Sequence, residues 1–210
     1  MGAMASPITI STYIAEFTTS VVSRWGALAP WELTSRSAEI VRSVIEAASA
    51  DTFKIADGIA VHGTAVIESG AILKGPLMIG AGCFVAAGAY LRGGCWVGAD
   101  CVLGPGVELK SSFVFSGARI AHFNYVGDSL LGSGVNLEAG SVICNCRNER
   151  TDGEVRVRLG PALHRTGSRK FGALVGDGSR IGANAVVAPG ALLLPGSVIG
   201  RTALCDQEAR

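Results

Sequence analysis

Aliphatic residues recur at every sixth position over much of the chain. The series begins at residue 55 and does not miss a position, with members Ile55, Val61, Ile67, Leu73, Ile79, Val85, Leu91, Val97, Leu103 and Leu109. A second, mostly small residue follows four positions after each of them. A six-residue unit is too short to bury a core alone, so successive units must stack into a solenoid. The pattern predicts an all-β rod over residues 53–204.

The six-residue series is shortened twice by one residue. It moves first to Val114, Ile120 and Val126, and then to Leu131, Leu137 and Ile143. These two irregular units bracket the stretch from Leu109 to Asn145. We expect the turns there to be pushed outward and to break the smooth surface of the rod.

Residues 147–170 interrupt the series altogether. The segment GEVRVRLG alternates like a short β-ribbon, and PALHRTGSRK has no apolar face. The series then resumes at Val175, Ile181, Val187, Leu193 and Ile199. The sequence therefore predicts a loop or arm at 147–170 that projects from a continuous rod, and a short tail at 205–210.

Residues 1–52 have a helical spacing of apolar positions instead. One face would carry Ile10, Tyr13, Ile14, Phe17, Val21 and Val22, and a second would carry Ile40, Val41, Val44 and Ile45. Pro30 suits the first turn of a helix. We expect two amphipathic α-helices, joined around residues 26–30, that cap the exposed end of the rod.

Composition and charge exclude several classes of partner. Hydrophobic residues make up 49% of the chain, but no window reaches the eighteen or so uninterrupted apolar residues of a membrane span, so no membrane partner is expected. A net charge of +1 without runs of like charge argues against nucleic acid. The first residues, MGAMASP, lack the basic and apolar regions of a secretory signal, which makes the cytoplasm the expected location.

The cysteines and histidines do not predict a metal site. Cys83, Cys95 and Cys101 occupy the small inward position of the repeat and are expected to be buried structural thiols. Cys144 and Cys146 form a Cys-x-Cys pair that no second pair completes into a zinc site. A zinc rod of the carbonic anhydrase kind needs several histidines at neighbouring turns, and His62, His122 and His164 are poorly spaced for that. We predict no metal.

One histidine stands in an informative setting. His122 lies in the turn sequence IAHFNYVGD and not at an inward aliphatic position. Imidazole ordinarily titrates near neutrality, which suits a general base that frees an amine or hydroxyl nucleophile. A smooth rod offers no deep pocket within one chain, so a cleft there would need the arm or a neighbouring subunit.

The segment HFNYVGDSLLGSGVNLEAGSVICN resembles the acetyltransferase half of the bifunctional enzymes that make UDP-N-acetylglucosamine, with His-x-x-Tyr-x-Gly-Asp, Gly-x-Asn-x-x-Ala-Gly and Cys-Asn in order. The resemblance implies a left-handed parallel β-helix with three hexapeptides in each coil, assembled as a homotrimer with sites between the rods. It also implies acetyl transfer from acetyl-CoA to the amine of glucosamine-1-phosphate, in nucleotide-sugar biosynthesis. Small-molecule partners, an amino-sugar phosphate and coenzyme A, follow.

The resemblance also suggests roles for individual residues. AYLRGG, VELKSS and RKFGALVGD resemble the family's phosphate-binding segments and assign that role to Arg92, Lys110 and Lys170. His122 would be the general base, with Glu108 supporting it. The sugar would contact Tyr125 and Asn136, its amine Asn145, the developing oxyanion the backbone near Ala139 and Gly140, and coenzyme A the last coils at Ala183 and Arg201.

Two departures from the family leave other functions open. About fifty helical residues stand where the family has its uridyltransferase domain, and the 147–170 segment looks more like the arm of archaeal nucleotidyltransferase-acetyltransferases. One alternative is an acyltransferase of the same fold that takes a longer acyl chain from a carrier protein. Another is a non-catalytic rod that scaffolds or regulates a separate nucleotidyltransferase subunit.

Overall fold

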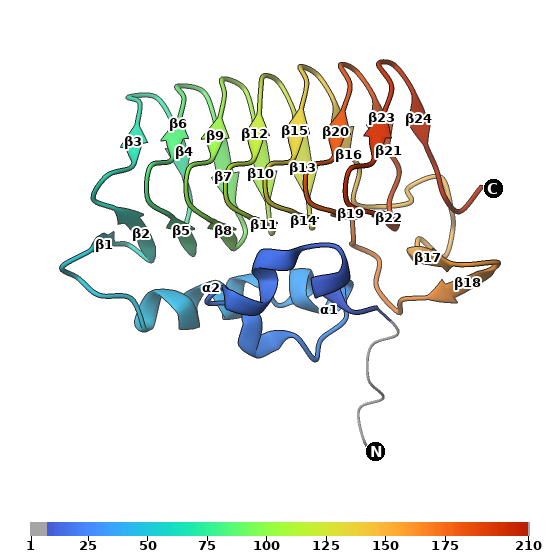
Figure 1. Cartoon of the computed structure of the whole chain (residues 1–210), viewed down its shortest axis with the longest axis horizontal. Helices are drawn as coiled ribbons and strands as arrows, with labels where there is room; N and C mark the ends of the chain where they lie inside the picture. Colours follow the sequence, from blue (N-terminus) through green and yellow to red (C-terminus); the bar gives the residue numbers. More distant parts are fainter. Residues whose placement is uncertain (1–7, 210) are drawn as a thin grey trace.

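The computed structural model describes residues 8–209; the MGAMASP segment lies outside this range. Strands from successive repeats stack into three parallel sheets, which form the three faces of a prism (Figure 1). The chain visits sheets A, B and C in turn and then begins the next coil. The predicted left-handed parallel β-helix is confirmed.

Each sheet takes one short strand from every coil. Sheet A contains β1 Phe53–Ala56, β2 Ile59–His62, β5 Leu77–Ile79, β8 Cys95–Val97, β11 Phe113–Val114, β14 Leu130–Leu131, β19 Ala173–Val175 and β22 Ala191–Leu193. Sheet B contains β3 Val66–Ile67, β6 Phe84–Val85, β9 Val102–Leu103, β12 Arg119–Ile120, β15 Asn136–Leu137, β20 Arg180–Ile181 and β23 Val198–Ile199. Sheet C contains β4 Ile72–Leu73, β7 Tyr90–Arg92, β10 Glu108–Lys110, β13 Tyr125–Gly127, β16 Val142–Ile143, β21 Val186–Val187 and β24 Leu204–Cys205.

The repeating aliphatics fill the interior of the prism. From Ile79 to Leu193 every member of the series is buried in one continuous cluster, including the members after each shortened unit. Cys83, Cys95 and Cys101 lie in the same cluster, so the prediction that they are buried is confirmed. Burial raises the pKa of the Cys95 thiol to about 11, which suits a structural thiol.

The start of the series is an exception. Ile55 is 42% exposed because β1 pairs with β2 as an antiparallel hairpin and does not join the parallel stack. The prediction that Ile55 opens the core series was therefore wrong. Val61 is the first member of the series that packs against the core.

Both shortened units fall at the corner where sheet C passes to sheet A. Ser111 and Asp128 stand at this C–A corner with φ of 49° and 47°. Left-handed backbone conformation lets the chain turn there with one residue fewer. The 147–170 insertion leaves the rod from the same corner one coil later, between β16 and β19.

The N-terminal extension differs from the prediction in two respects. Its first part forms three short 3₁₀ helices, η1 Ile10–Thr12, η2 Ala15–Thr19 and η3 Ser23–Trp25, instead of an amphipathic α-helix. Hydroxyl side chains compete with the helical ladder there, because Thr18, Thr19 and Ser20 each donate to a carbonyl three residues earlier. The second part is α-helical as expected, with α1 Pro30–Ser35 and α2 Ser37–Glu46.

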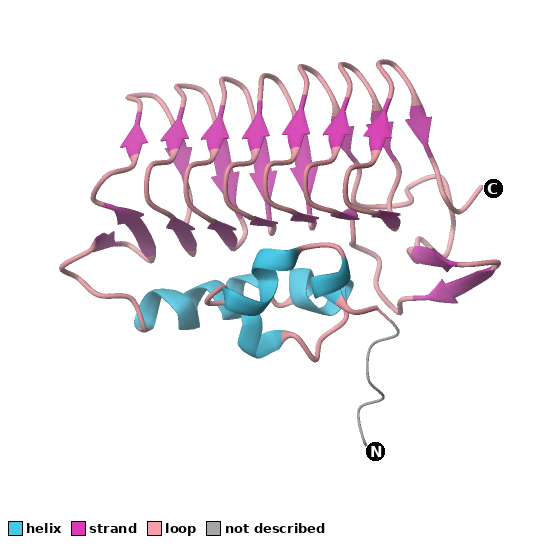
Figure 2. Ribbon diagram, viewed as in Figure 1, coloured by secondary structure: helices cyan, strands magenta, loops and turns pink. Residues whose placement is uncertain are grey.

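The extension covers the side of the rod and not its end. Its apolar residues pack on the outward-facing residues of sheet A and form a second core (Figures 1 and 2). Phe115 contacts Phe17 and Trp96, with ring centroids 6.2 and 5.1 Å apart, and Trp31 meets Phe171 edge to face at 6.0 Å. The predicted end-capping role was therefore wrong, since a long apolar face offers more area to bury than the end of the rod does.

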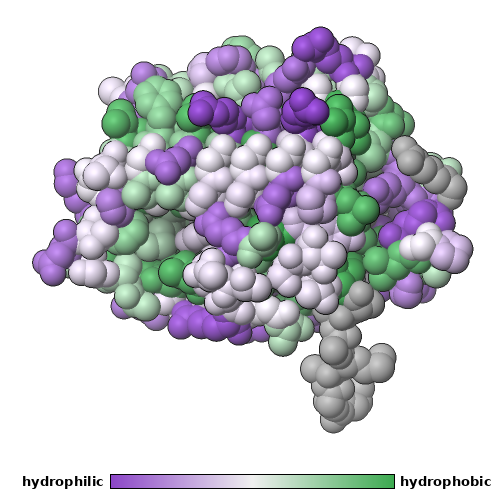
Figure 3. Space-filling model, viewed as in Figure 1, coloured by the Kyte–Doolittle hydropathy of each residue, from purple (hydrophilic) through white to green (hydrophobic). Residues whose placement is uncertain are grey.

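A recess remains between the extension and the first coils. It has a volume of about 660 Å³, and its apolar walls include Val44, Met78 and Trp96. The hydrophobic surface in this part of the molecule is visible in Figure 3.

The insertion forms the predicted ribbon, but the chain end is not a free tail. Strands β17 Arg156–Leu159 and β18 Ala162–Arg165 pair antiparallel, and Val155 and Val157 are buried in the second core. Cys205 belongs to β24 and is buried, so the β-helix extends beyond the predicted boundary at 204. Within residues 8–209 no helix is both long and apolar enough to cross a bilayer.

Candidate active site on sheet C and the B–C corner

The outer face of sheet C carries a column of polar side chains. Along β7, β10 and β13 the residues Leu91, Leu109 and Val126 point into the core. Their neighbours must point outward because side chains alternate along a strand. The outward set includes four predicted site residues, Arg92, Glu108, Lys110 and Tyr125.

Arg92 and Glu108 form an ion pair in this column. Arg92 Nε and Nη2 both donate to Glu108 Oε1, at 2.9 and 2.6 Å. The bond to Glu108 raises the pKa of Arg92. Glu108 was predicted to support His122 electrostatically. Its carboxylate bonds Arg92, and among the described residues no hydrogen bond joins it to His122, so that role stays a prediction.

Lys110 and Asn145 share one carboxylate, that of Asp128. Lys110 Nζ lies 2.9 and 2.8 Å from the two Asp128 oxygens, and the Asn145 side-chain amide donates to Asp128 Oδ2. Asp128 is 4% exposed, so this carboxylate is nearly removed from water. It was not predicted as a site residue, although it stands inside the quoted Tyr-x-Gly-Asp sequence.

Tyr125 completes the cluster. A side chain at Gly127 would lie 2.5 Å from the Tyr125 hydroxyl and 2.8 Å from Asn145 Nδ2, so glycine is what allows both groups to approach the backbone here. Burial, with smaller effects from Asp128 and Glu108, raises the pKa of Tyr125 to about 12. The hydroxyl is therefore protonated near neutrality and can donate a hydrogen bond.

A further cation extends the column toward the first coils. Lys74, Arg92 and Lys110 are separated by 18 residues each (92 − 74 and 110 − 92), which is one coil of three hexapeptides. Lys74 Nζ lies 5.3 Å and Arg92 Cζ 5.6 Å from the centroid of the Tyr90 ring. Lys74 was missed, although its 18-residue spacing from Arg92 is a signal that the sequence contains.

His122 lies at the corner between sheets B and C, three residues before Tyr125. This B–C corner is fixed by Asn124, which is 2% exposed; its Oδ1 accepts from the His122 backbone at 2.9 Å, and its Nδ2 donates to Glu138 O at 2.7 Å. His122 itself is exposed, as a turn position predicts. Asn124 was missed as the residue that shapes this turn.

The residues expected to meet the acetyl group and coenzyme A stack on the same corner. Gly140 N donates to His122 O at 2.8 Å, Asn184 N to Ala139 O at 3.0 Å, and Thr202 N to Ala183 O at 2.9 Å. The Gly140 amide is therefore committed to the backbone ladder and is not free for an oxyanion, which corrects the prediction. Of the two predicted amides only that of Ala139 remains a candidate.

A groove on sheet B borders this corner. It has a volume of about 320 Å³ and is lined by Asn136, Glu138, Arg180 and Arg201, among others. Arg201 donates to both oxygens of Glu138, at 2.8 and 2.9 Å, and this contact lowers the pKa of Glu138. Asn136 thus lies on sheet B, across the corner from the cluster on sheet C.

Lys170 lies where the insertion returns to the rod. It is exposed, and the next residue, Phe171, donates its backbone N–H to Asn145 O at 3.0 Å. The two ends of the insertion therefore meet beside the Asp128 cluster. Across residues 8–209 no three His, Cys, Asp or Glu side chains gather as metal ligands do.

Comparisons with known proteins agree with the six-residue repeat. Residues 76–111 match the model of the bacterial transferase hexapeptide (six repeats). A bifunctional sugar-1-phosphate nucleotidylyltransferase/acetyltransferase from Sulfurisphaera tokodaii is 38% identical over 104 residues, which are 47% of this chain and 25% of that protein. The bifunctional protein GlmU of Methanococcus maripaludis is 33% identical over 185 residues, 85% of this chain and 44% of that protein.

The chain therefore carries the hexapeptide repeat of the bacterial transferases. Its β-helix resembles the acetyltransferase-like C-terminal part of GlmU-type enzymes, as the sequence predicted. The chain spans less than half the length of these curated relatives. Among solved structures, the acetyltransferase domain of PglB from Neisseria gonorrhoeae aligns over 79% of this chain and 64% of that one, with 19% identity and a TM-score of 0.37.

Proposed function

We propose that this chain is an acetyl-CoA-dependent N-acetyltransferase whose acceptor is an amino-sugar 1-phosphate of the glucosamine-1-phosphate kind. The observation that carries the proposal is the convergence of Arg92, Lys110, Tyr125 and Asn145 around Asp128 and Glu108. His122 stands at the corner from which β13, the strand of Tyr125, begins. A phosphorylated amine needs cations for its phosphate, a hydrogen-bond donor and a base for its ammonium group, and these residues supply all three.

The cations of the column would bind the acceptor phosphate. Ion pairs with Glu108 and Asp128 hold Arg92 and Lys110 in fixed positions before any ligand arrives. Both pairs keep part of their surface in water, with 35% of the Arg92 and 22% of the Lys110 side chain exposed, so each cation can also face a phosphate oxygen. Lys170 would add a third cation from the insertion.

His122 would act as the general base. The acceptor amine is an ammonium ion in water, so a proton must leave its nitrogen before the lone pair can attack the thioester carbonyl of acetyl-CoA. Attack gives a tetrahedral adduct whose nitrogen still carries two protons. The adduct expels the coenzyme A thiolate, and the imidazolium gives its proton to that sulfur. The neutral imidazole then takes the second proton from the nitrogen, which leaves the amide, and releases that proton to solvent. The Ala139 amide would stabilise the oxyanion. No covalent acyl-enzyme is needed.

Coenzyme A would lie along the B–C corner and the sheet B groove. The groove presents the cations Arg180 and Arg201, which suit the phosphates of coenzyme A. The stacked turns of the B–C corner link Ala183, Ala139 and His122 in successive coils. The donor and the acceptor would thus approach one corner from two adjacent sheets.

A neighbouring subunit would close the site. The extension and the insertion pack on sheet A (Figure 1), and among the described residues the second core takes no strand residue from sheet B or sheet C. Acyl transfer benefits from excluding water, which an open outer face does not do. We therefore propose a homotrimer in which another rod faces the B–C corner.

A panel of acceptors tests the proposal. Release of free coenzyme A thiol should depend on glucosamine-1-phosphate, galactosamine-1-phosphate or a nucleotide-linked amino sugar, and the unphosphorylated amino sugar should react at least about 100-fold less efficiently because it leaves Arg92 and Lys110 without their ligand. Failure of every phosphorylated acceptor would reject the proposed function.

A further inference from the structure

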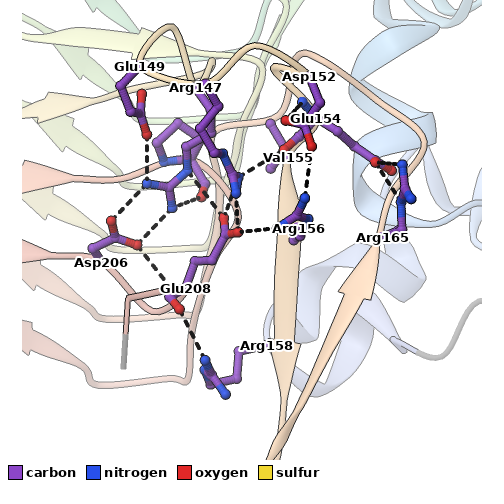
Figure 4. Close-up of polar contacts among 12 residues, drawn as sticks. Arg147, Glu149, Asp152, Glu154, Val155, Arg156, Arg158, Arg165, Asp206 and Glu208 are labelled. Carbon is purple, nitrogen blue, oxygen red and sulfur yellow. Dashed lines mark hydrogen bonds and ion pairs between the residues drawn. The ribbon is translucent and has the colours of Figure 1, made fainter.

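The C-terminal end of the chain is tied to the insertion by an extended network of charged residues (Figure 4). We name residues 206–208, Asp206, Gln207 and Glu208, the C-terminal clamp. They follow the last strand of sheet C and lie between the rod and the ribbon β17–β18. The network joins two parts of the chain that lie 49 to 59 residues apart in sequence, from Arg158 and Gln207 to Arg147 and Asp206.

Arg147 is the centre of this network. Its side chain is 7% exposed, and it forms a two-point contact with Asp206, Nη1 to Oδ2 at 2.8 Å and Nη2 to Oδ1 at 2.7 Å. Nη2 also donates to the carbonyl of Pro189 at 3.1 Å. A paired, nearly buried guanidinium with planar geometry leaves its segment little freedom to move.

Glu208 gathers two more arginines of the insertion. Arg150 Nη2 donates to Glu208 Oε2 at 2.7 Å, Arg150 Nη1 also contacts the carboxylate, and Arg156 Nη1 lies 3.4 Å from Oε1. Arg150 donates in addition to the carbonyl of Glu154 at 3.0 Å. Glu208 is therefore bonded to both the entry of the insertion and its first ribbon strand.

The clamp is in turn anchored to the rod. The side-chain amide of Gln207 forms two hydrogen bonds with the backbone of β22. Its Oε1 accepts from Leu192 N at 2.8 Å, and its Nε2 donates to Leu192 O at 2.9 Å. On its other side Arg158 Nε donates to Gln207 O at 2.6 Å. The clamp thus fastens the insertion to sheet A through backbone and side-chain bonds.

Both ends of the insertion meet the candidate active site. Asn145, two residues before Arg147, bonds Asp128 with its side chain and accepts from Phe171 with its carbonyl. Gly172 N donates to Asp128 O at 2.9 Å, so the returning chain is held at the same carboxylate residue. Asn145 and Lys170 flank the insertion, so a change in how its residues are held can shift both of them relative to Lys110.

We propose that Arg147, Asp206 and Glu208 are positioning residues for acceptor binding, because they lock the insertion so that Asn145 and Lys170 face the Lys110–Asp128 pair. The inference rests on the proposed function for its kinetic consequence, but its structural claim stands independently. None of the three residues touches the substrate in this account. They act through the conformation of residues 146–170.

The double variant Asp206→Asn, Glu208→Gln tests the clamp, because it keeps the size of both side chains and removes both charges. Protection factors for amide hydrogen exchange in the insertion should fall at least about tenfold, while those of the rod strands should not change. KM for the sugar phosphate should rise about tenfold or more, with KM for acetyl-CoA within about twofold of wild type. The single variant Asp206→Glu keeps both negative charges of the clamp, so it should keep much of the acceptor affinity that the double variant loses.

The control is Glu39→Gln, which removes one carboxylate from the exposed Arg36–Glu39 pair at the start of α2 and should change none of these quantities. Unchanged hydrogen exchange in the insertion of the double variant would overturn the clamp. So would equal rises in both KM values, which indicate general loosening. A wild-type protein without transferase activity would reject the proposed function while hydrogen exchange still decides the structural claim. If the double variant does not fold, Asp206→Asn alone answers the same question.

Discussion

The side-chain amide of Asn145 donates a hydrogen bond to the carboxylate of Asp128 from the next coil of the β-helix. The same carboxylate pairs with the Lys110 ammonium. Asn145, at the start of the insertion, and Lys110, on strand β10, therefore share one buried anion. This contact explains how an irregular insertion can contribute to a site that is otherwise built on regular strands.

Replacing Asp128 with Ala should weaken both stability and acceptor binding. The change leaves a Lys110 ammonium that is only 22% exposed without its partner and leaves the buried Asn145 amide without an acceptor. The free energy of unfolding should fall by about 3 kcal/mol. Urea unfolding measures this, and an unchanged midpoint would show that the carboxylate does not organise the cluster.

The aromatic residues on sheet A should carry much of the attachment of the N-terminal extension. Phe115 is fully buried between Phe17 and Trp96, whereas Phe123 at the B–C corner is 72% exposed. Phe115→Ala should lower the free energy of unfolding by about 3–5 kcal/mol. The matched control Phe123→Ala should stay within about 0.5 kcal/mol of wild type, and equal effects of the two changes would contradict the second core.

The cysteines should differ sharply in reactivity. Cys83, Cys95, Cys101 and Cys205 are buried, whereas Cys144 and Cys146 are partly exposed. The thiolate is the reactive form, and burial raises the pKa of Cys95 to about 11. Brief alkylation of the native protein, read by peptide mass spectrometry, should label Cys144 or Cys146 first. Early labelling of Cys95 would mean that the core is open.

The Arg147–Asp206 pair should make stability depend on pH in acid. The bond to Arg147 lowers the pKa of Asp206 to about 2, below the ordinary value near 3.9 that an unfolded chain would have. A depressed folded-state pKa contributes stability that is present above pH ~4 and is lost as the pH falls toward ~2.

Unfolding of wild type and Asp206→Asn across this range measures the contribution. Wild type should be the more stable protein at pH 6, and the difference should shrink steadily between about pH 4 and pH 2. A difference that does not change with pH would show that the pair contributes through packing and not through charge.

Much of the fold was predictable because the repeat itself is the fold. Each hexapeptide must place one aliphatic inward, so Ile79 through Leu193 could be assigned to the core by counting. The covered face was not predicted, although Met78, Trp96, Phe113, Phe115 and Leu130 are apolar at outward positions of sheet A. An apolar outward column on one face signals that another segment packs there. The 3₁₀ helix η2 is accompanied by hydroxyl–carbonyl bonds that apolar spacing does not report.

The positions of the candidate site residues were predictable where these residues follow the coil repeat, and their hydrogen-bond partners were not. Strand positions such as Arg92, Lys110 and Tyr125 meet because 17 or 18 residues make one coil, which the pairing of β7, β10 and β13 reflects. Which carboxylate each cation selects depends on side-chain reach, and this is why Asp128 was missed and the Arg92–Glu108 pair was not predicted. Asn145 and the C-terminal clamp lie far apart in the sequence, so no local sequence pattern reports that the insertion connects them.

The most direct test of the central claim is the mass of glucosamine-1-phosphate after incubation with acetyl-CoA and either wild type or His122→Ala. Wild type should add one acetyl group to the amine, and His122→Ala should do so at least about 100-fold more slowly while its melting temperature, set by residues away from this exposed turn, is unchanged. An acceptor that gains no mass with wild type, or gains it at the same rate with the variant, would contradict the account.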